Sequence, residues 1–131
     1  MKNKLNPYQE LTELYDPFGI FGVQSILFES FKKIMFAGCD GRKKGRKRDL
    51  KEAKYSIERA VRVIEKEGLS GKVEWINADY IRILRGKYSG VVTDKLQFET
   101  GIMVLEFCNT EAIALLRDVV RFLKQMIRDN K

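Results

Sequence analysis

Apolar residues spaced three and four positions apart constrain the fold of this 131-residue chain more than any other feature. Between Asp49 and Gly68 this spacing places one set of apolar side chains on a single face of an α-helix. The set is Leu50, Ala53, Ile57, Ala60, Val61 and Ile64. Asp49 and Glu52 form the pattern of a capping box, which predicts that the helix begins near Asp49. Glycines at 68 and 71 predict its end.

The same spacing recurs on both sides of this segment. It predicts a first long helix over about 20–36, with Gly38 in the position of a C-terminal cap glycine. A third segment, 73–84, has mostly helical spacing, but its β-branched and aromatic residues leave a strand open. Glycines at 86 and 90 then predict a loop.

The last apolar-periodic stretch covers about 94–128. Gly101 and the pair Asn109-Thr110 are the two places where this stretch could kink or split, and 102–107 alone could form a strand. We therefore predict an all-α fold, a small helical bundle of four or five helices in a single domain over 1–131. A short β-hairpin within 73–107 remains an alternative.

Residues 1–19 are predicted to form an N-terminal arm, because Pro7 and Pro17 bracket only a short helical candidate. Half of the chain's aromatic residues lie in its first 37 positions, and the helix over 20–36 is apolar over a wide arc. A surface of this kind predicts a homo-oligomer or a protein partner. The predicted interface residues are Phe18, Phe21, Phe28 and Phe31.

Positive charge is concentrated in one short run. Six of the seven residues Arg42–Arg48 are basic, and they lie in a predicted flexible loop over 38–48. The chain has 25 Lys and Arg against 18 Asp and Glu, and without this run the balance would be 19 against 18. A concentrated positive field recruits polyanions, since each neutralised phosphate releases counterions. The predicted loop contacts are Arg42, Lys43, Lys44, Arg46, Lys47 and Arg48.

The basic loop leads into a stripe on the helix that follows. Five residues spaced four, four, three and four apart are predicted to face solvent opposite the apolar face, namely Lys51, Tyr55, Arg59, Arg62 and Lys66. A secondary basic stripe near the C-terminus has the same kind of spacing and comprises Arg117, Arg121, Lys124 and Arg128. We predict that these residues contact nucleic acid, DNA or RNA, through its phosphates.

Catalytic motifs are scarce. The chain has no histidine, which excludes Ser-His-Asp and Cys-His arrangements and histidine metal sites. The glycines around the basic run do not form a Walker loop, because the Gly-Lys-Ser/Thr ending and a preceding strand are missing. We therefore predict no cofactor, no metal and no catalytic residue, and favour a non-enzymatic protein.

Carboxylates leave one enzymatic alternative open. Glu99 and Glu106 are seven residues apart and would share a face of a continuous helix, where they and Glu111 could converge with acids of the 49–67 helix. Such a cluster would fit a metal-dependent helical nucleotide hydrolase. The acids of the 49–67 helix alternate with basic residues, however, and are better explained as ion pairs such as Lys54–Glu58.

Two cysteines and the lack of an apolar segment after the basic N-terminus predict a reducing, cytoplasmic location. Charged residues interrupt the most hydrophobic stretch, 18–37, so no membrane span is expected. The leading hypothesis is a small non-enzymatic nucleic-acid-binding protein, an accessory subunit of a nucleoprotein complex. The first alternative is a protein-interaction, inhibitor or assembly module that uses the aromatic N-terminal helix.

Overall fold

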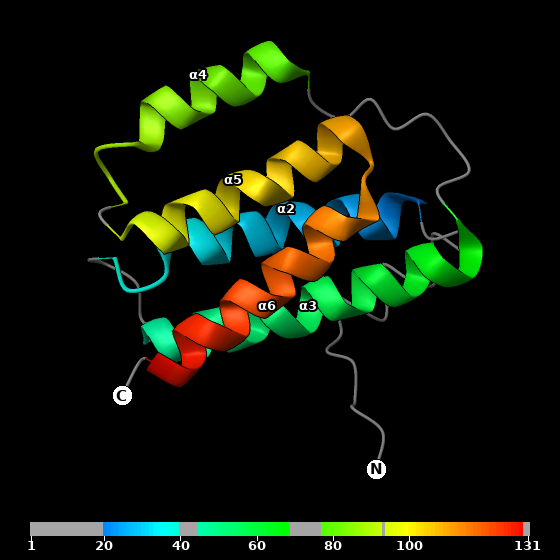
Figure 1. Ribbon diagram of the computed structural model, residues 1–131, viewed down its shortest axis with the longest axis horizontal. Helices are drawn as coiled ribbons and strands as arrows, with labels where there is room; N and C mark the ends of the chain where they lie inside the picture. Colours follow the sequence, from blue (N-terminus) through cyan, green and yellow to red (C-terminus); the bar gives the residue numbers. More distant parts are fainter. Residues whose placement is uncertain (1–19, 40–44, 69–76, 93, 130–131) are drawn as a thin grey trace.

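The computed structural model describes residues 20–39, 45–68, 77–92 and 94–129 (Figure 1). These residues form five α-helices and no strand, which confirms the all-α prediction. The helices are α2 (Ile20–Phe36), α3 (Arg46–Glu67), α4 (Ala78–Tyr88), α5 (Lys95–Thr110) and α6 (Ile113–Asp129). The alternative of a β-hairpin is wrong for the described part of 73–107, because α4 and α5 occupy it. The predicted arm over 1–19 lies outside the described residues.

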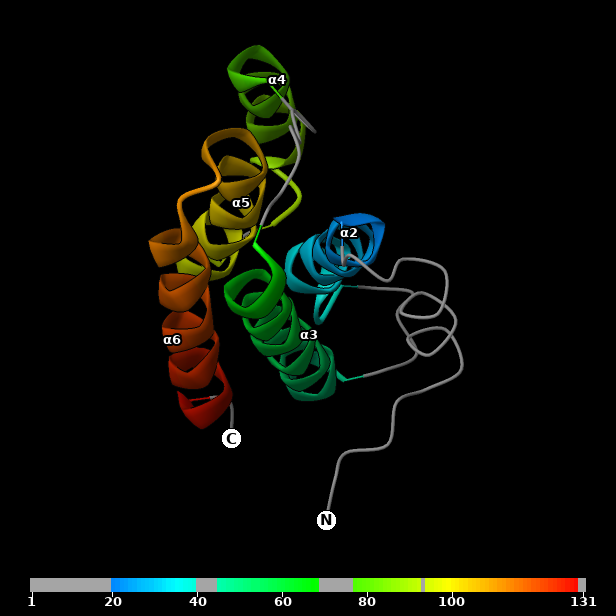
Figure 2. The same ribbon diagram turned by 90° about the vertical axis from the view of Figure 1, so that its right-hand side faces the viewer.

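The helices pack around one hydrophobic core. α2 packs on α3 and α5, and α6 packs on the same two helices, while α4 packs on α5 and places the Tyr88 ring against Phe36 of α2 (Figures 1 and 2). α6 runs antiparallel to α3, so the end of α6 and the start of α3 lie at the same end of the molecule. α4 lies at the opposite end from α3 in both views. The surface formed by α3 and α6 is therefore separate from the surface formed by α4.

The residues that follow the apolar periodicity of the sequence form the core. Leu27 and Ile34 of α2, Leu50 and Ile57 of α3 and Leu123 of α6 are all fully buried. The structure confirms the predicted span of α2, which ends before Gly38 in a left-handed conformation with φ of 80°. Glycine suits this position because it has no Cβ to clash in that conformation.

The predicted start of the second helix is wrong by one turn. α3 begins at Arg46 with Gly45 as its N-cap, and Asp49 lies fully buried in the first turn instead of capping it. Lys and Arg are good helix formers, so the end of the basic run joins the helix rather than the loop. A carboxylate in the first turn also interacts favourably with the helix dipole.

The C-terminal stretch divides at one of the two predicted places. α5 continues through Gly101, where α2 approaches so closely that a Cβ would overlap the sulfur of Met35. The chain instead turns at Glu111, which adopts a left-handed conformation with φ of 61° directly after Thr110. Gly86 was predicted in a loop but lies inside α4, which begins where the Asn77 side chain accepts a hydrogen bond from the Tyr80 amide.

Candidate nucleic-acid interface

The structure divides the basic run into two parts. Arg42, Lys43 and Lys44 lie outside the described residues. Arg46, Lys47 and Arg48 form the first turn of α3, so their prediction as loop residues is wrong. Because a helix fixes the directions of its side chains, these three have different surroundings.

Arg46 is anchored inside the fold. It is half-buried, its Nε donates a hydrogen bond of 3.0 Å to Oε1 of Gln97, and its guanidinium lies 3.6 Å from the Asp94 carboxylate. Gln97 is buried and donates through Nε2 to the carbonyls of Ile34 and Ala37 at the end of α2. Arg46 thus holds the start of α3 against α2 and α5. Nothing local in the sequence signals this contact, since Gln97 is 51 residues away.

Arg59 does not face solvent, and its inclusion in the exposed stripe is wrong. Its exposed fraction is 4%. Burial, followed by the nearby charge of Arg62, lowers the pKa of Arg59 below its ordinary value. The reason is helical geometry: eight residues advance about 80° beyond two full turns, so Arg59 is rotated away from Lys51 toward the buried side of α3.

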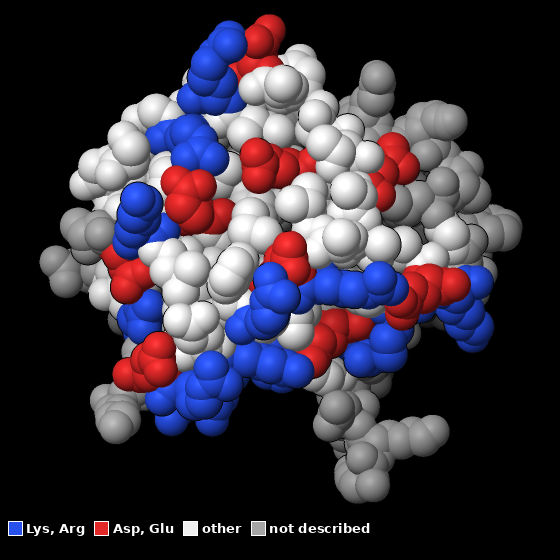
Figure 3. All heavy atoms as spheres, viewed as in Figure 1, with Lys and Arg blue, Asp and Glu red and all other residues white. Residues whose placement is uncertain are grey.

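The other members of the two stripes remain at the surface. On α3, Lys51, Arg62 and Lys66 are exposed and Tyr55 is half-buried. All four basic residues of the secondary stripe on α6 are exposed, while Leu116 on the same helix is fully buried. Figure 3 shows Lys and Arg side chains gathered over α3 and α6, with Asp and Glu side chains between them.

The sequence did not predict that the two stripes adjoin. α3 and α6 pack against each other, and Arg117 forms an ion pair with Glu65 across the boundary between them. A shallow hollow of about 290 Å³ lies on this boundary, lined by Glu58, Val61, Arg62, Arg117 and Val120. We call the combined surface the α3–α6 face. Its exposed basic residues are Lys47, Arg48, Lys51, Arg62, Lys66, Arg117, Arg121, Lys124 and Arg128.

Many cations of the α3–α6 face have no acidic partner. Three of its arginines do: Arg48 pairs with Glu52, Arg117 with Glu65, and Arg121 with Asp118. Within the described residues, eight Lys and Arg side chains form no salt bridge, and six of the eight belong to this face. The six are Lys47, Lys51, Arg62, Lys66, Lys124 and Arg128, and the other two are Lys87 and Lys95.

The predicted pairing of Lys54 with Glu58 is confirmed at 3.2 Å. Pairs of this kind that remain accessible to solvent are weak, because solvent screens them and holding two long side chains costs entropy. They therefore neutralise the face only in part, and the unpaired cations leave a net positive surface along both helices.

The acidic residues do not form the cluster that a hydrolase would need. Glu99 pairs with Arg85 of α4 at 2.7 Å, an interaction that raises the pKa of Arg85. α5 packs mainly on α2, α4 and α6, and its contact with α3 at Arg46 and Gln97 does not bring Glu99 and Glu106 together with the acids of α3. In the described part of the chain, no three His, Cys, Asp or Glu residues come together as a metal site.

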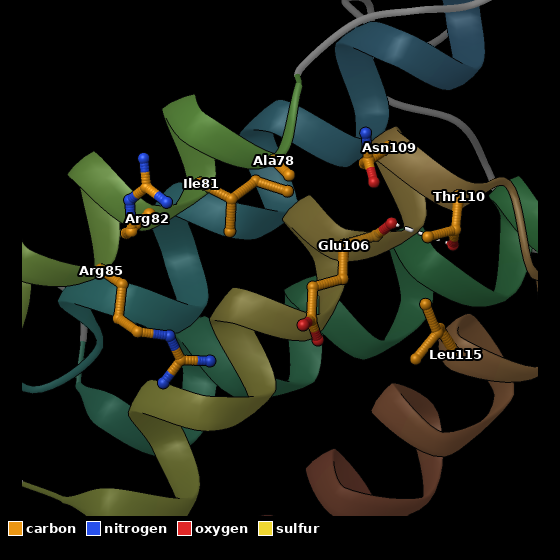
Figure 4. Close-up of a pocket in the computed structure, with 8 residues that line it drawn as sticks. All are labelled: Ala78, Ile81, Arg82, Arg85, Glu106, Asn109, Thr110 and Leu115. Carbon is orange, nitrogen blue, oxygen red and sulfur yellow. Dashed lines mark hydrogen bonds between the residues drawn. The ribbon is translucent and has the colours of Figure 1, made fainter.

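Glu106 instead lines a second pocket, of about 350 Å³, between α4, α5 and the start of α6 (Figure 4). Arg82 and Arg85 reach it from α4, and Thr110 lies at its far side. Arg82 already pairs with Asp79, so both arginines of this pocket have carboxylate partners. It is a less charged site than the α3–α6 face.

The predicted aromatic interface is not supported where it is described. Phe31 is 8% exposed and belongs to the core, so its prediction as an interface residue is wrong. Phe28 is half-buried against the same core. Phe18 lies outside the described residues, and the side chain of Phe21 is not described either.

The two cysteines are unpaired. Cys108 is buried, and burial raises the pKa of its thiol to about 12, while Cys39 is half-buried. None of the described helices combines the length and the apolar character needed to span a membrane.

Comparison of the chain with protein-family models, with curated proteins and with solved structures found no match. The candidate site is therefore defined by its own geometry and charge.

Proposed function

We propose that this protein binds nucleic acid through the phosphate backbone, with the α3–α6 face as the contact surface. The observation that carries the proposal is the gathering of six cations without salt bridges on two packed helices. In sequence, Arg42, Lys43 and Lys44 directly precede α3 and add to the positive charge at its start. Polyanions are the partners that such a surface recruits most strongly.

The dimensions of the face suit an extended polyanion. α3 has 22 residues and is about 33 Å long at 1.5 Å per residue. A duplex of that length carries on the order of twenty phosphates, so several cations can each find one. Contacts to phosphates fix position without reading bases, and we therefore expect weak sequence preference. Such binding suits an accessory subunit of a nucleoprotein complex.

The test is binding to mixed-sequence DNA and RNA across a salt series, by fluorescence anisotropy. If about six phosphates are neutralised on duplex DNA, the plot of log affinity against log salt has a slope near −5. Absence of binding at about 50 mM salt, where such contacts are strong, would overturn the proposal.

Matched variants locate the site. Lys51→Gln with Arg62→Gln removes two unpaired cations from the face, and the control Lys87→Gln with Lys95→Gln removes two unpaired cations from elsewhere. Both pairs change net charge equally. We expect the first pair to weaken binding and to reduce the salt slope by about 2, and the control to change both much less. Equal losses in both variants would mean that net charge, rather than this face, governs binding.

A further inference from the structure

α4 presents an apolar surface that the described fold leaves uncovered. Three large hydrophobic residues of the described chain have exposed fractions of 50% or more: Tyr80 at 51%, Ile83 at 65% and Val91 at 50%. All three lie on α4 or just after it. α4 packs on α5 through a side that includes the buried Ile81, and its last residue, Tyr88, contacts Phe36 of α2. Tyr80, Ile83 and Lys87 lie within about 60° of one another, on a side turned about 100–160° away from Ile81.

We propose that this surface, defined by Asp79, Tyr80, Ile83, Gly86 and Lys87 and called the α4 face, joins two copies of the protein in an antiparallel helix pair. The proposal places self-association on α4 instead of on the phenylalanines at 18, 21, 28 and 31 that the sequence suggested. It does not depend on nucleic-acid binding. Three features of α4 favour a second copy over other occupants.

The first feature is Gly86. Glycine inside a helix is unfavourable, yet Gly86 does not have a positive φ, and a Cβ built there meets nothing within 4 Å. The fold of one copy therefore gives no reason for glycine at this position. A residue without a side chain on the flank of an exposed helix does let another helix approach closely, because side chains at the contact set the distance between helix axes.

The second feature is the order of charges along the α4 face. Asp79 lies in the first turn and Lys87 in the last. Antiparallel pairing about Ile83 brings the Asp79 end of the α4 face of one copy against the Lys87 end of the other, twice in a two-fold dimer. Asp79 has only an exposed pairing with Arg82, and Lys87 forms no salt bridge within the described residues. Both charges are therefore available to the second copy.

The third feature is the position of Tyr80 relative to Lys87. Both lie on the same flank of α4, so the antiparallel arrangement places the Tyr80 ring of one copy near the Lys87 ammonium of the other. Ammonium groups over aromatic rings attract each other. Ile83 meets Ile83 at the two-fold axis, which covers the most exposed apolar side chain of the described protein. The surface is thus complementary to itself.

The first experiment measures mass by sedimentation across a protein concentration series. A contact built on one short helix is small, and we expect dimers with a Kd in the range of about 10–100 µM. Ile83→Lys should give monomers throughout, while the control Ala114→Lys, at another exposed helical position, should dimerise like the unmodified protein. Monomers of the unmodified protein at all concentrations, or dimers that Ile83→Lys leaves intact, would overturn the proposal.

The second experiment tests the antiparallel register by charge exchange. Asp79→Lys leaves both ends of the α4 face positive, and Lys87→Asp leaves both ends negative, so each variant alone should dimerise about tenfold more weakly. In an equimolar mixture, each positive end again meets a negative end, and heterodimers should form with the original affinity. A mixture that associates no better than the separate variants would rule out this register.

The third experiment uses Gly86→Ala. The new methyl group has open space in a single copy, so thermal unfolding by circular dichroism should show a higher Tm. In the dimer the same methyl group holds the helices apart and should weaken association. A higher Tm with unchanged association would contradict close approach at Gly86, and because this variant gains stability, weakened association could not be attributed to misfolding.

Discussion

At the scale of single residues, the most informative side chain is Gln97. It is 4% exposed and joins three helices, since it donates to two carbonyls at the end of α2, accepts from Arg46 of α3 and belongs to α5 itself. These hydrogen bonds hold the start of the basic helix in place. The backbone amide of Gln97 also donates a hydrogen bond to the side chain of Asp94, the N-cap residue of α5.

Replacing Gln97 with Leu should therefore destabilise the protein strongly. Two buried carbonyls and the Arg46 guanidinium would each lose a hydrogen-bond partner, at a combined cost of about 2–4 kcal/mol in the free energy of unfolding. Urea denaturation measures this difference. Gln125→Leu, at an exposed position of α6, is the matched control and should change stability by less than about 0.5 kcal/mol. Similar effects in both variants would contradict the role assigned to Gln97.

The two helical glycines that face different surroundings give a second prediction. Gly101→Ala should destabilise the protein by about 1–2 kcal/mol, because the added methyl group overlaps the fully buried Met35 side chain. Gly86→Ala should instead stabilise it by up to about 1 kcal/mol through helix propensity alone. Thermal unfolding of the two variants, measured at protein concentrations too low for dimers to form, checks that the two changes in stability have opposite signs. Stabilisation by Gly101→Ala would show that α2 and α5 readily move apart.

The buried thiol of Cys108 gives a prediction about pH. Burial raises its pKa from an ordinary value of 9.0 to about 12. Between these values the unfolded chain ionises this thiol while the folded protein keeps it neutral, so stability should be complete below about pH 9 and fall as pH rises toward 12. Comparing urea unfolding of the protein and of Cys108→Ala at pH 8 and pH 10.5 isolates this contribution. A pH dependence identical in both proteins would contradict it.

At the scale of elements, sequence periodicity located the helices but did not predict which of their charged residues reach the surface. The core positions of α3 and α6 follow directly from apolar spacing, because burying one face is what stabilises an amphipathic helix. Arg59 was misplaced since an arginine is polar at one end only, and its apolar stem allows burial at the edge of a helix face. The anchoring of Arg46 depends on a residue of α5, and no local pattern encodes such a contact.

α3 also has an unfavourable arrangement of charges at its start. Its first turn contains Arg46, Lys47 and Arg48, whose charges are repelled by the positive end of the helix dipole. The carboxylate of Asp49 offsets this repulsion only in part. A bound phosphate would relieve this repulsion. The same cations that weaken the free helix are thus suited to an anionic ligand.

Charge reversal at the two ends of α3 tests this trade between stability and binding. Lys47→Glu should stabilise the free protein by about 0.3–1 kcal/mol, while Lys66→Glu, near the negative end of the dipole, should destabilise it by a similar amount. Both changes should weaken nucleic-acid binding, because both remove an unpaired cation from the α3–α6 face. Urea denaturation and anisotropy, each at low salt, measure the two effects. Weaker binding by Lys66→Glu alone would confine the contact to the end of α3 away from the basic run.

At the scale of the whole molecule, the two proposed surfaces lie apart. The α3–α6 face and α4 are at opposite ends of the molecule in both views (Figures 1 and 2). Their separation follows from the packing order, in which α4 packs mainly on α5 while α3 packs mainly on α2 and α6. A dimer formed through α4 would leave both α3–α6 faces uncovered and directed away from each other.

Such a dimer should hold two nucleic-acid segments at once. A capture experiment distinguishes this bridging from the binding of a single segment. DNA attached to beads, incubated with the protein and then with a second, labelled DNA, should retain the label. Ile83→Lys should bind the first DNA but fail to capture the second, because it removes self-association and leaves every residue of the α3–α6 face in place. Lys51→Gln with Arg62→Gln should dimerise normally and retain less of both DNAs. Capture by Ile83→Lys at the level of the unmodified protein would show that one copy holds both segments, and the two faces would then not act as the separate ends of a bridge.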